Sequence, residues 1–256
     1  MRPLILIPSF NSGRILKKTV QDCLEVSDDW PVLVVIDGST DGSASELEEF
    51  ASHPRLLVIS YEKNRGKGHA LMVGAEVAEE EGYTHLLTID SDSQHPVDFI
   101  PRYIDLATQY PDAVICGRPI FDENAPMIRQ QGRKIANALV HLETFGWGVD
   151  DVLFGMRCYP LDVFLRGMRE TRWGRRYDFD TEIVARFAWA EVPAINFPTP
   201  VRYLSSEEGG ISHFHYVRDN TLFVGTHLRL LGGFLIRLPG FLIRPKKNPL
   251  IDIPID

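Results

Sequence analysis

The residues best placed to do chemistry are two carboxylates at the end of an apolar run. Asp90 closes the segment 86–90, and Asp92 follows two positions later. Side chains at i and i+2 of an extended segment point to one side, so the two carboxylates can converge where a buried strand ends. Converging carboxylates need a counter-charge, and the amide of Gln94 adds a further oxygen. The pattern favours Mg²⁺ or Mn²⁺, although a strand end capped by turn-forming Asp and Ser is the alternative interpretation.

Length, charge and cysteine content narrow the class of protein. The chain has 256 residues, enough for one large domain or two small ones. Its net charge of −8 argues against nucleic-acid binding. The three cysteines are far apart, which predicts buried free thiols and a reducing compartment. The N-terminal residues lack a leader pattern, and no unbroken apolar run reaches about 18 residues, so we expect no membrane-spanning helix.

Short apolar runs alternate with helical patterns in the first hundred residues. We expect strands at 4–8, 32–36, 56–60 and 85–90, and helices at 14–26, 43–51 and 69–81. This alternation predicts an open, mainly parallel α/β sheet. Ligands of such sheets bind beyond the carboxyl ends of the strands. Pro8, Asp37 and the Asp90–Asp92 pair lie at those ends, which is the first indication of a site.

The second half of the chain has a less regular pattern. Its helical segments are predicted at 97–109, 129–145, 161–169 and 181–190, and its strands at 113–116, 152–159 and 201–204. A polar, aromatic loop at 173–180 contains a second Asp-x-Asp triplet, Asp178 to Asp180. We therefore expect further functional residues in this half.

Four motifs in this order resemble a glycosyltransferase of family two with the GT-A fold. They are Ile7–Asn11, Asp37–Gly42, Asn64–Gly68 and Asp90–Pro96. The last is similar to the dolichyl- or polyprenyl-phosphate mannose synthase branch, whose further motifs resemble Gly117-Arg118, Arg133-Lys134 and Phe154–Arg157. The resemblance covers roughly residues 3–215. It implies a GT-A domain at 1–215, with a nucleotide-sugar-binding half (1–117) and an acceptor half (118–215), followed by a tail at 216–256.

The resemblance also implies roles for individual residues. The nucleotide-sugar donor, a UDP- or GDP-hexose, would be bound by Pro8, Asn11, Asp37, Lys67 and Asp90. A Mg²⁺ or Mn²⁺ ion would be held by Asp92, Gln94 and Asp90. The loop residue His213 could complete the metal shell or contact the leaving diphosphate, and a purely structural or exposed histidine is the alternative. Phosphate of donor or acceptor would be met by Arg118, Arg133 and Arg202.

The chain departs from the family pattern at two places. The family usually has paired acids at the end of the second strand, whereas here Ile36 precedes Asp37. The lipid-phosphate branch tends to carry an arginine before its Gly-x-Ser, whereas here Glu207 and Glu208 precede Gly210–Ser212. The first departure leaves the base preference open, and the second weakens the case for a phosphate acceptor.

The acceptor class decides whether a base is needed. An alcohol must lose a proton, whereas a phosphate is already ionised. Asp180 resembles the family's base position, with Asp178 as the second candidate, while N-capping of the predicted helix at 181–190 is the alternative for Asp180. One base and one displacement suffice, so we predict inversion at the anomeric carbon.

The tail combines apolar and basic residues. Between His213 and Lys247 there are six basic residues and one acidic residue, interleaved with many Leu, Ile and Phe. Arg229, Arg237 and Pro239 interrupt the apolar run. We predict a basic amphipathic helix lying on an anionic membrane surface, or else packed on the domain or on a second subunit.

The sequence thus predicts an inverting, metal-dependent transferase that is cytoplasmic and peripheral on the inner face of the cell membrane. It would move a hexose to a lipid-associated acceptor, with polyprenyl phosphate as the most specific choice. A hydroxyl on another lipid or glycan precursor and a non-catalytic sugar-nucleotide-binding subunit stay open, as does a homodimer. A nucleotidyltransferase would need a basic, glycine-rich loop after the first strand, and residues 9–13 contain no Lys or Arg.

Overall fold

The computed structural model describes residues 1–122, 127–146, 149–170, 173–202, 216–243 and 250–252. The strands are β1 (Pro3–Ser9), β2 (Val32–Asp37), β3 (Leu56–Tyr61), β4 (His85–Thr88), β5 (Val114–Phe121), β6 (Arg157–Pro160), β7 (Ala194–Val201) and β8 (Leu250–Asp252). The helices are α1 (Gly13–Glu25), α2 (Lys67–Glu80), α3 (Ile100–Gln109), α4 (Met127–Glu143), α5 (Leu161–Arg169), α6 (Phe179–Trp189) and α7 (Tyr216–Ile243), with short 3₁₀ turns at Ser45–Phe50 and Val97–Phe99.

All the strands join one sheet in the order β3-β2-β1-β4-β6-β5-β7-β8. Every pairing is parallel except those of β6, which runs antiparallel to β4 and β5. The mainly parallel α/β sheet that the sequence predicts is therefore confirmed. The reversal at β6 was not predicted, and the strand expected at 152–159 spans only Arg157–Pro160.

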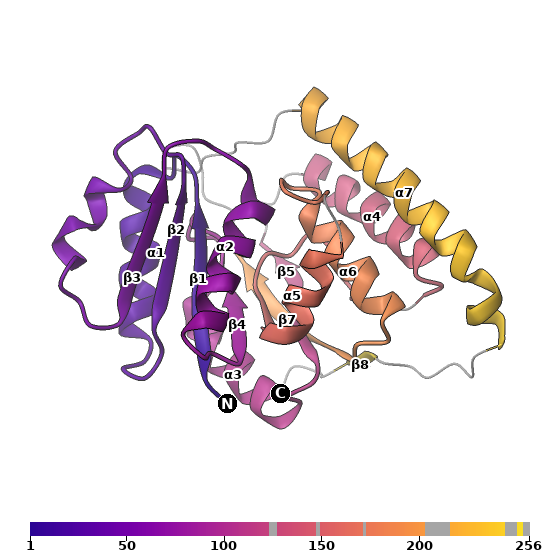
Figure 1. Ribbon diagram of the computed structural model, residues 1–256, viewed down its shortest axis with the longest axis horizontal. Coiled ribbons are helices and arrows are strands. Elements are labelled where there is room, and N and C mark those ends of the chain that lie inside the picture. The colour runs from indigo at the N-terminus through magenta and orange to yellow at the C-terminus, as the bar shows by residue number, and fades with distance from the viewer. Residues whose placement is uncertain (123–126, 147–148, 171–172, 203–215, 244–249, 253–256) are drawn as a thin grey trace.

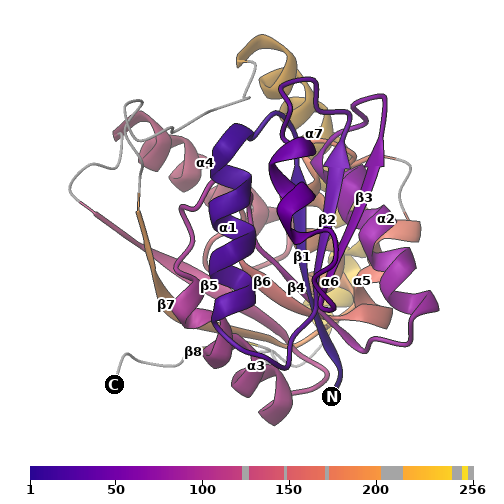
Figure 2. The same ribbon diagram turned by 90° about the vertical axis from the view of Figure 1, so that its left-hand side faces the viewer.

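Helices cover both faces of the sheet (Figures 1 and 2). Alternate strand residues enter two separate cores, as Ile5 and Ile7 pack with α1 and α3 while Leu4 and Leu6 pack with α2, α5 and α6. Because both faces of the central strands are buried, β1 and β2 are apolar almost throughout. β3 forms the edge of the sheet, and Leu57 on it is half exposed.

Several predicted elements are shifted by a few residues from those observed. The helix predicted at 181–190 begins two residues earlier, at Phe179. The strand predicted at 201–204 lies instead at Ala194–Val201 and contains Pro198 and Pro200. Proline cannot donate a ladder hydrogen bond. These prolines are tolerated because the pairing with β8 involves only residues 194–196 of β7 in the described chain.

Helix α7 packs against α4 and α6 at one side of the molecule (Figure 1). Its buried side places Phe234 and Phe241 against Phe145, with ring centroids 6.5 and 6.0 Å apart. By length and composition, the part from Arg218 to Ile243 could cross a membrane, contrary to the expectation from the sequence. The helix continues through Pro239, and only a few charged residues interrupt it.

Candidate active site

The carboxyl ends of β1, β2 and β4 meet at one edge of the sheet, next to the N-terminus of α2. The turn into α2 requires glycine at Gly66, because its φ of +103° is a conformation that other residues rarely adopt. A Cβ on Gly68 would lie 2.2 Å from the carbonyl oxygen of Gly174. These glycines allow the loop before α6 to lie directly on the start of α2, which brings the second half of the chain to the strand ends.

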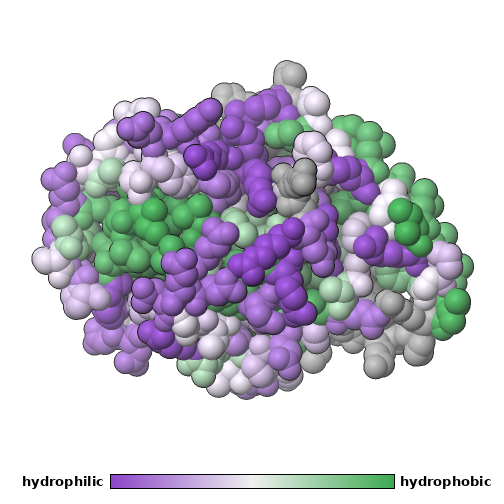
Figure 3. All heavy atoms as spheres, viewed as in Figure 1, coloured by the Kyte–Doolittle hydropathy of each residue, from purple (hydrophilic) through white to green (hydrophobic). Residues whose placement is uncertain are grey.

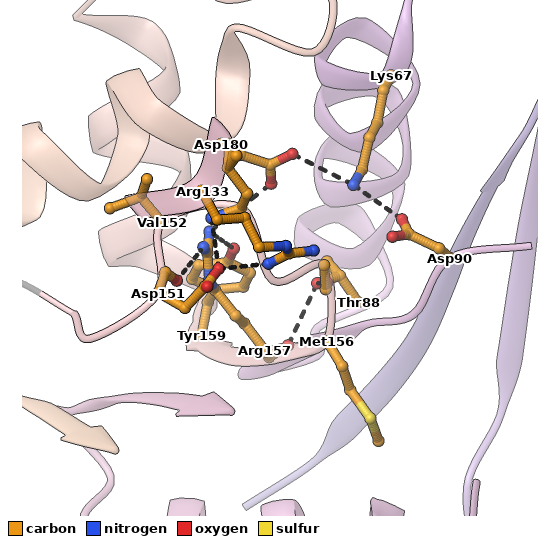
Figure 4. A network of polar contacts seen from close by, with 12 residues as sticks. Lys67, Thr88, Asp90, Arg133, Asp151, Val152, Met156, Arg157, Tyr159 and Asp180 are labelled. Carbon is orange, nitrogen blue, oxygen red and sulfur yellow. Dashed lines mark hydrogen bonds and ion pairs between the residues drawn. The ribbon is translucent and has the colours of Figure 1, made fainter. Parts of the chain in front are cut away.

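Lys67 joins two carboxylates that are far apart in the sequence (Figure 4). Its Nζ lies 2.8 Å from Oδ1 of Asp90 and 3.3 Å from Oδ2 of Asp180. Burial would lower the pKa of Lys67, but the two carboxylates outweigh it and raise that pKa above its usual range. Burial likewise opposes ionisation of Asp90, yet Lys67 and His95 hold the pKa of Asp90 well below its ordinary value. The three charged groups therefore form one ionised cluster.

The carboxylate of Asp90 lies in a closely fitting pocket. Its Oδ2 is 3.2 Å from Nε2 of His95, whose ring packs edge-on against Phe154. A Cβ on Gly155 would lie 2.1 Å from Oδ2 of Asp90, so only glycine leaves room for the carboxylate there. Thr88 Oγ1 donates to the carbonyl oxygen of Gly155 at 2.8 Å and holds that backbone in position. The orientation of Asp90 is thus set by packing as well as by charge.

Asp92 is the carboxylate of this group that has no cationic partner among the described residues. Its Oδ1 accepts a hydrogen bond from the backbone N of Gln94 at 3.1 Å. Burial, followed by the negative charge of Asp90, raises the pKa of Asp92. The described residues contain no group of three or more His, Cys, Asp or Glu side chains that could hold a metal ion. His213 lies outside the described residues.

The donor set nevertheless fits a magnesium or manganese ion. Mg²⁺ is commonly held by one or two carboxylates together with substrate phosphates, rather than by a cage made of protein alone. Asp92 is a half-buried carboxylate that forms no ion pair among the described residues, and a cation would relieve its repulsion with Asp90. The two carboxylate oxygens of Asp90, by contrast, already contact Lys67 and His95.

Asp37 holds the turn before α2. Its two carboxylate oxygens accept hydrogen bonds from the backbone N atoms of Arg65 and Gly66, at 2.7 and 2.6 Å, and from the side chain of Asn64 at 3.0 Å. The residue is 2% exposed. Both oxygens of Asp37 are therefore already hydrogen-bonded. A nucleotide that binds here, as predicted, would contact the turn that Asp37 holds rather than a free carboxylate.

The other residues predicted to bind the donor lie on the same edge. Pro8 is buried in β1. Asn11 adopts a left-handed conformation with φ +47°, which asparagine tolerates better than most residues. Its Oδ1 accepts a hydrogen bond from the backbone N of Thr40 at 2.7 Å, and its own N donates to Oγ of Ser39 at 2.9 Å. Asn11 thus ties the loop after β1 to the loop after β2.

The two acids of the second Asp-x-Asp triplet have different surroundings. Asp178 occupies the N-cap position of α6 and accepts hydrogen bonds from the backbone N atoms of Gly174 and Arg176 and from Thr226 of α7. Asp180 lies inside the first turn, so the alternative interpretation of Asp180 as the N-cap is wrong. Asp180 points to Lys67 instead. The geometry thus gives Asp178 a structural environment and brings Asp180 to the site.

Two of the predicted phosphate-binding arginines pair with consecutive acids. Arg118 of β5 lies 3.2 Å from Asp150, and Arg133 of α4 lies 2.6 Å from Asp151. The backbone N of Arg202, after β7, donates to the carbonyl oxygen of Gln94 at 3.1 Å, so Arg202 lies beside the Asp92 loop. All three arginines come from the second half of the chain.

No role was predicted for Arg157 from the sequence, although this residue lies in the motif Phe154–Arg157. Its side chain is fully buried in β6. Its Nη1 lies 3.7 Å from Oδ1 of Asp180 and 3.4 Å from the hydroxyl of Tyr159, and its Nη2 donates to the carbonyl oxygen of Asp151 at 3.1 Å. An arginine within the apolar run 152–159 was the available signal, because buried charges need partners.

Residues 4–179 match the family described as "Glycosyl transferase family 2", which is more than half of the chain. The chain belongs to glycosyl transferase family 2. This confirms the family resemblance inferred from the strand-end motifs. Membership of the family leaves donor, acceptor and metal to be inferred from the site.

Similar curated proteins of this family carry names that refer to lipid phosphates. The undecaprenyl-phosphate 4-deoxy-4-formamido-L-arabinose transferase of Edwardsiella ictaluri is 29% identical over 165 residues, which is 62% of this chain and 49% of that protein. The polyprenol monophosphomannose synthase of Mycolicibacterium smegmatis is 27% identical over 202 residues, 75% of this chain and 76% of that protein. The match therefore spans about half the length of the first of these relatives.

Solved structures confirm the fold of this family 2 protein. Glucosyl-3-phosphoglycerate synthase from Mycobacterium tuberculosis, in complex with Mn²⁺, UDP and phosphoglyceric acid, superposes with a TM-score of 0.65 at 16% identity, covering 90% of this chain and 78% of that one. Its complex with Mg²⁺ and UDP gives a TM-score of 0.64. The GT-A-like arrangement predicted from the sequence is the one observed.

Proposed function

We propose that this protein transfers a hexose from a UDP- or GDP-sugar to the phosphate of a polyprenyl phosphate. The observation that carries the proposal is the ionised cluster of Lys67, Asp90 and Asp180 beside the unpaired Asp92. It lies where parallel strands end, the usual place for a nucleotide in such sheets. The names of the relatives support a lipid-phosphate acceptor.

On the donor side, Asp92 and Gln94 would hold Mg²⁺ or Mn²⁺ against the diphosphate. When bound, the ion stabilises the charge that develops on the leaving diphosphate, an effect worth several kcal/mol. Lys67 supplies a second positive charge from the start of α2. Asp90 orients Lys67 from one side, and Asp180 from the other.

On the acceptor side, the surroundings of Asp180 favour a phosphate over an alcohol. A general base needs a carboxylate lone pair directed at the acceptor proton. The two oxygens of Asp180 instead face Lys67 and Arg157. An ionised phosphate needs no base, and Arg118 and Arg133 offer guanidinium groups suited to phosphate. We therefore propose that Asp180 holds Lys67 in place rather than taking a proton.

The reaction is then a single displacement. A phosphate oxygen of the acceptor forms a bond to the anomeric carbon while the bond from that carbon to the diphosphate oxygen breaks. The electron pair leaves with the diphosphate, and no proton is transferred. One displacement inverts the configuration at the anomeric carbon.

An acceptor comparison tests this function. Vesicles carrying polyprenyl phosphate or polyprenol would be incubated with UDP- and GDP-hexoses and Mn²⁺, and the lipids analysed by mass spectrometry. We expect product from the phosphate lipid alone. Asp180→Asn keeps an oxygen for Lys67, so we expect about a tenfold lower kcat with an unchanged pH profile, less than the 10²–10⁴-fold typical of a lost general base. If the wild type transfers the sugar to polyprenol and Asp180→Asn does not, the hydroxyl acceptor is supported and the phosphate acceptor is refuted.

We also propose that α7, with α4 beside it, rests on the membrane at the cytoplasmic face. From Val224 onward the exposed side of α7 is mainly apolar (Figure 3), and Ile236 and Ile243 are 80% and 83% exposed. Two of the arginines of α7 contact neighbouring elements, since Arg229 pairs with Glu182 and Arg237 packs over Trp189. This is more apolar than the predicted basic amphipathic helix, and such a surface suits the interfacial region of a bilayer. The remainder of the predicted basic tail, at 244–249 and 253–256, lies outside the described residues.

Vesicle flotation checks this placement. In the variant Leu228→Gln/Leu235→Gln/Leu242→Gln, three exposed leucines of α7 become polar, and we expect at least a tenfold weaker association with anionic vesicles because apolar burial drives the binding. Ile135→Gln/Leu142→Gln on α4 should have a smaller effect of the same sign. Leu57→Gln on β3 is the matched control and should float like the wild type. Equal flotation of all variants would exclude a membrane role for α7.

A further inference from the structure

Arg157 occupies a position between the donor and acceptor sides of the site (Figure 4). One branch of contacts leads from its Nη1 to Asp180, at 3.7 Å, and from Asp180 to Lys67, at 3.3 Å. The other leads from its Nη2 to the carbonyl oxygen of Asp151, at 3.1 Å, and from the carboxylate of Asp151 to Arg133, at 2.6 Å. A single buried guanidinium therefore contacts both branches.

The surroundings of Arg157 make it rigid. It lies on β6, the antiparallel strand between β4 and β5, where Thr88 and Cys116 are its register partners. The hydroxyl of Tyr159 lies 3.4 Å from Nη1, and burial raises the pKa of Tyr159 to about 12, so this hydroxyl stays neutral. The planar guanidinium of an arginine on a central strand can hold two partner groups in a fixed geometry, whereas the flexible ammonium of a lysine cannot.

We infer that Arg157 is a positioning residue that sets Lys67 and Arg133 relative to each other, through Asp180 and Asp151. The inference rests on the proposed function, in which Lys67 acts on the leaving diphosphate and Arg133 on the acceptor phosphate. Arg157 itself is fully buried and touches neither substrate. Replacing Arg157 should therefore change both kcat, through Lys67, and the KM for the acceptor, through Arg133.

The contacts predict different results for two substitutions. Arg157→Met removes both branches, so we expect kcat to fall about tenfold and the KM for polyprenyl phosphate to rise about tenfold. Arg157→Lys keeps a positive charge near Asp180 but cannot also reach the carbonyl oxygen of Asp151. We expect it to retain kcat within about threefold while the acceptor KM stays about tenfold raised.

The matched control is Arg186→Met. Arg186 is also largely buried, and it pairs with Glu182, which stands two residues after Asp180 on α6. Its loss should lower thermal stability and leave both kinetic constants unchanged. The double variant Arg157→Met/Arg133→Met should raise the acceptor KM no further than Arg133→Met alone, because both changes break the contacts that run through Asp151.

Thermal unfolding of each variant shows whether the kinetics report on folded protein. If Arg157→Met does not fold, Arg157→Lys decides alone. Separation of kcat from acceptor KM in Arg157→Lys supports the inference, whereas equal losses in both constants, or no loss, overturn it. Release of nucleoside diphosphate without acceptor gives a second readout, which Arg157→Met should slow and Arg157→Lys should not. If the wild type releases diphosphate but does not glycosylate polyprenyl phosphate, the proposed acceptor is refuted. The release of diphosphate would still test the role of Arg157.

Discussion

Asp92→Asn should abolish sugar transfer, lowering kcat/KM by about 10³-fold, equivalent to roughly 4 kcal/mol of transition-state stabilisation. Asparagine keeps the size of the side chain and the oxygen that accepts from Gln94. It lacks the charge that would hold Mg²⁺ or Mn²⁺ against the diphosphate. The loss should therefore come mainly from the metal-dependent rate, measured as transfer over a Mn²⁺ titration.

The same substitution should leave the folded protein at least as stable as the wild type without metal. The carboxylate of Asp92 is half-buried near the negative charge of Asp90, so removing its charge relieves a repulsion. Asp22→Asn, which removes a surface partner of Lys18 on α1, is the control and should keep full activity. A metal-dependent rate in Asp92→Asn equal to that of the wild type would disprove the assignment of Asp92 as the metal ligand.

Lys67→Met should produce the second large effect, a fall in kcat of about 10²–10³-fold. The ammonium lies between Asp90 and Asp180, next to the proposed leaving group. Removing a preorganised charge at a developing anion typically costs a factor of this size. The measurement is release of UDP or GDP from the sugar nucleotide at saturating Mn²⁺.

The substitution should also destabilise the fold by about 3 kcal/mol, the lower end of the range for breaking a buried pair, because it leaves the buried Asp180 and the partly exposed Asp90 without their shared cation. Lys67→Met/Asp180→Asn should recover part of that stability, but not the activity. Lys63→Met, in the exposed turn before α2, is the matched control and should change neither property. Normal turnover by a folded Lys67→Met protein would exclude Lys67 from the reaction.

The charge pattern of the tail did not predict which side of α7 is exposed. The basic residues of the tail suggested a helix with a charged, exposed face. In the structure, Arg229 pairs with Glu182 of α6 and Arg237 packs over Trp189, so part of the charge on α7 is held against the protein. Which side of a helix is covered depends on its neighbours, and α4 and α6 are brought there only by the fold.

The amino-acid sequence alone determined the parallel sheet and the edge at which the site lies. Parallel strands share one polarity, so residues that follow apolar runs, such as Asp37 and Asp90, must gather at the same edge. For the same reason Asp92, two residues beyond the end of its run, was predictable as a neighbour of Asp90. Family-like motifs then identified the chemistry that this edge supports.

Only the tertiary structure decided which of these acids are free to act. Asp37 and Asp178 have their oxygens occupied by backbone N–H groups of neighbouring turns, whereas Asp180 reaches Lys67 across 113 positions of sequence. A carboxylate has the same signature in the sequence in either environment. What distinguishes them is the direction of nearby N–H groups and the exact start of α6, and both are set by long-range packing. The antiparallel insertion of β6, which carries Arg157 into the centre of the site, depends on the same packing.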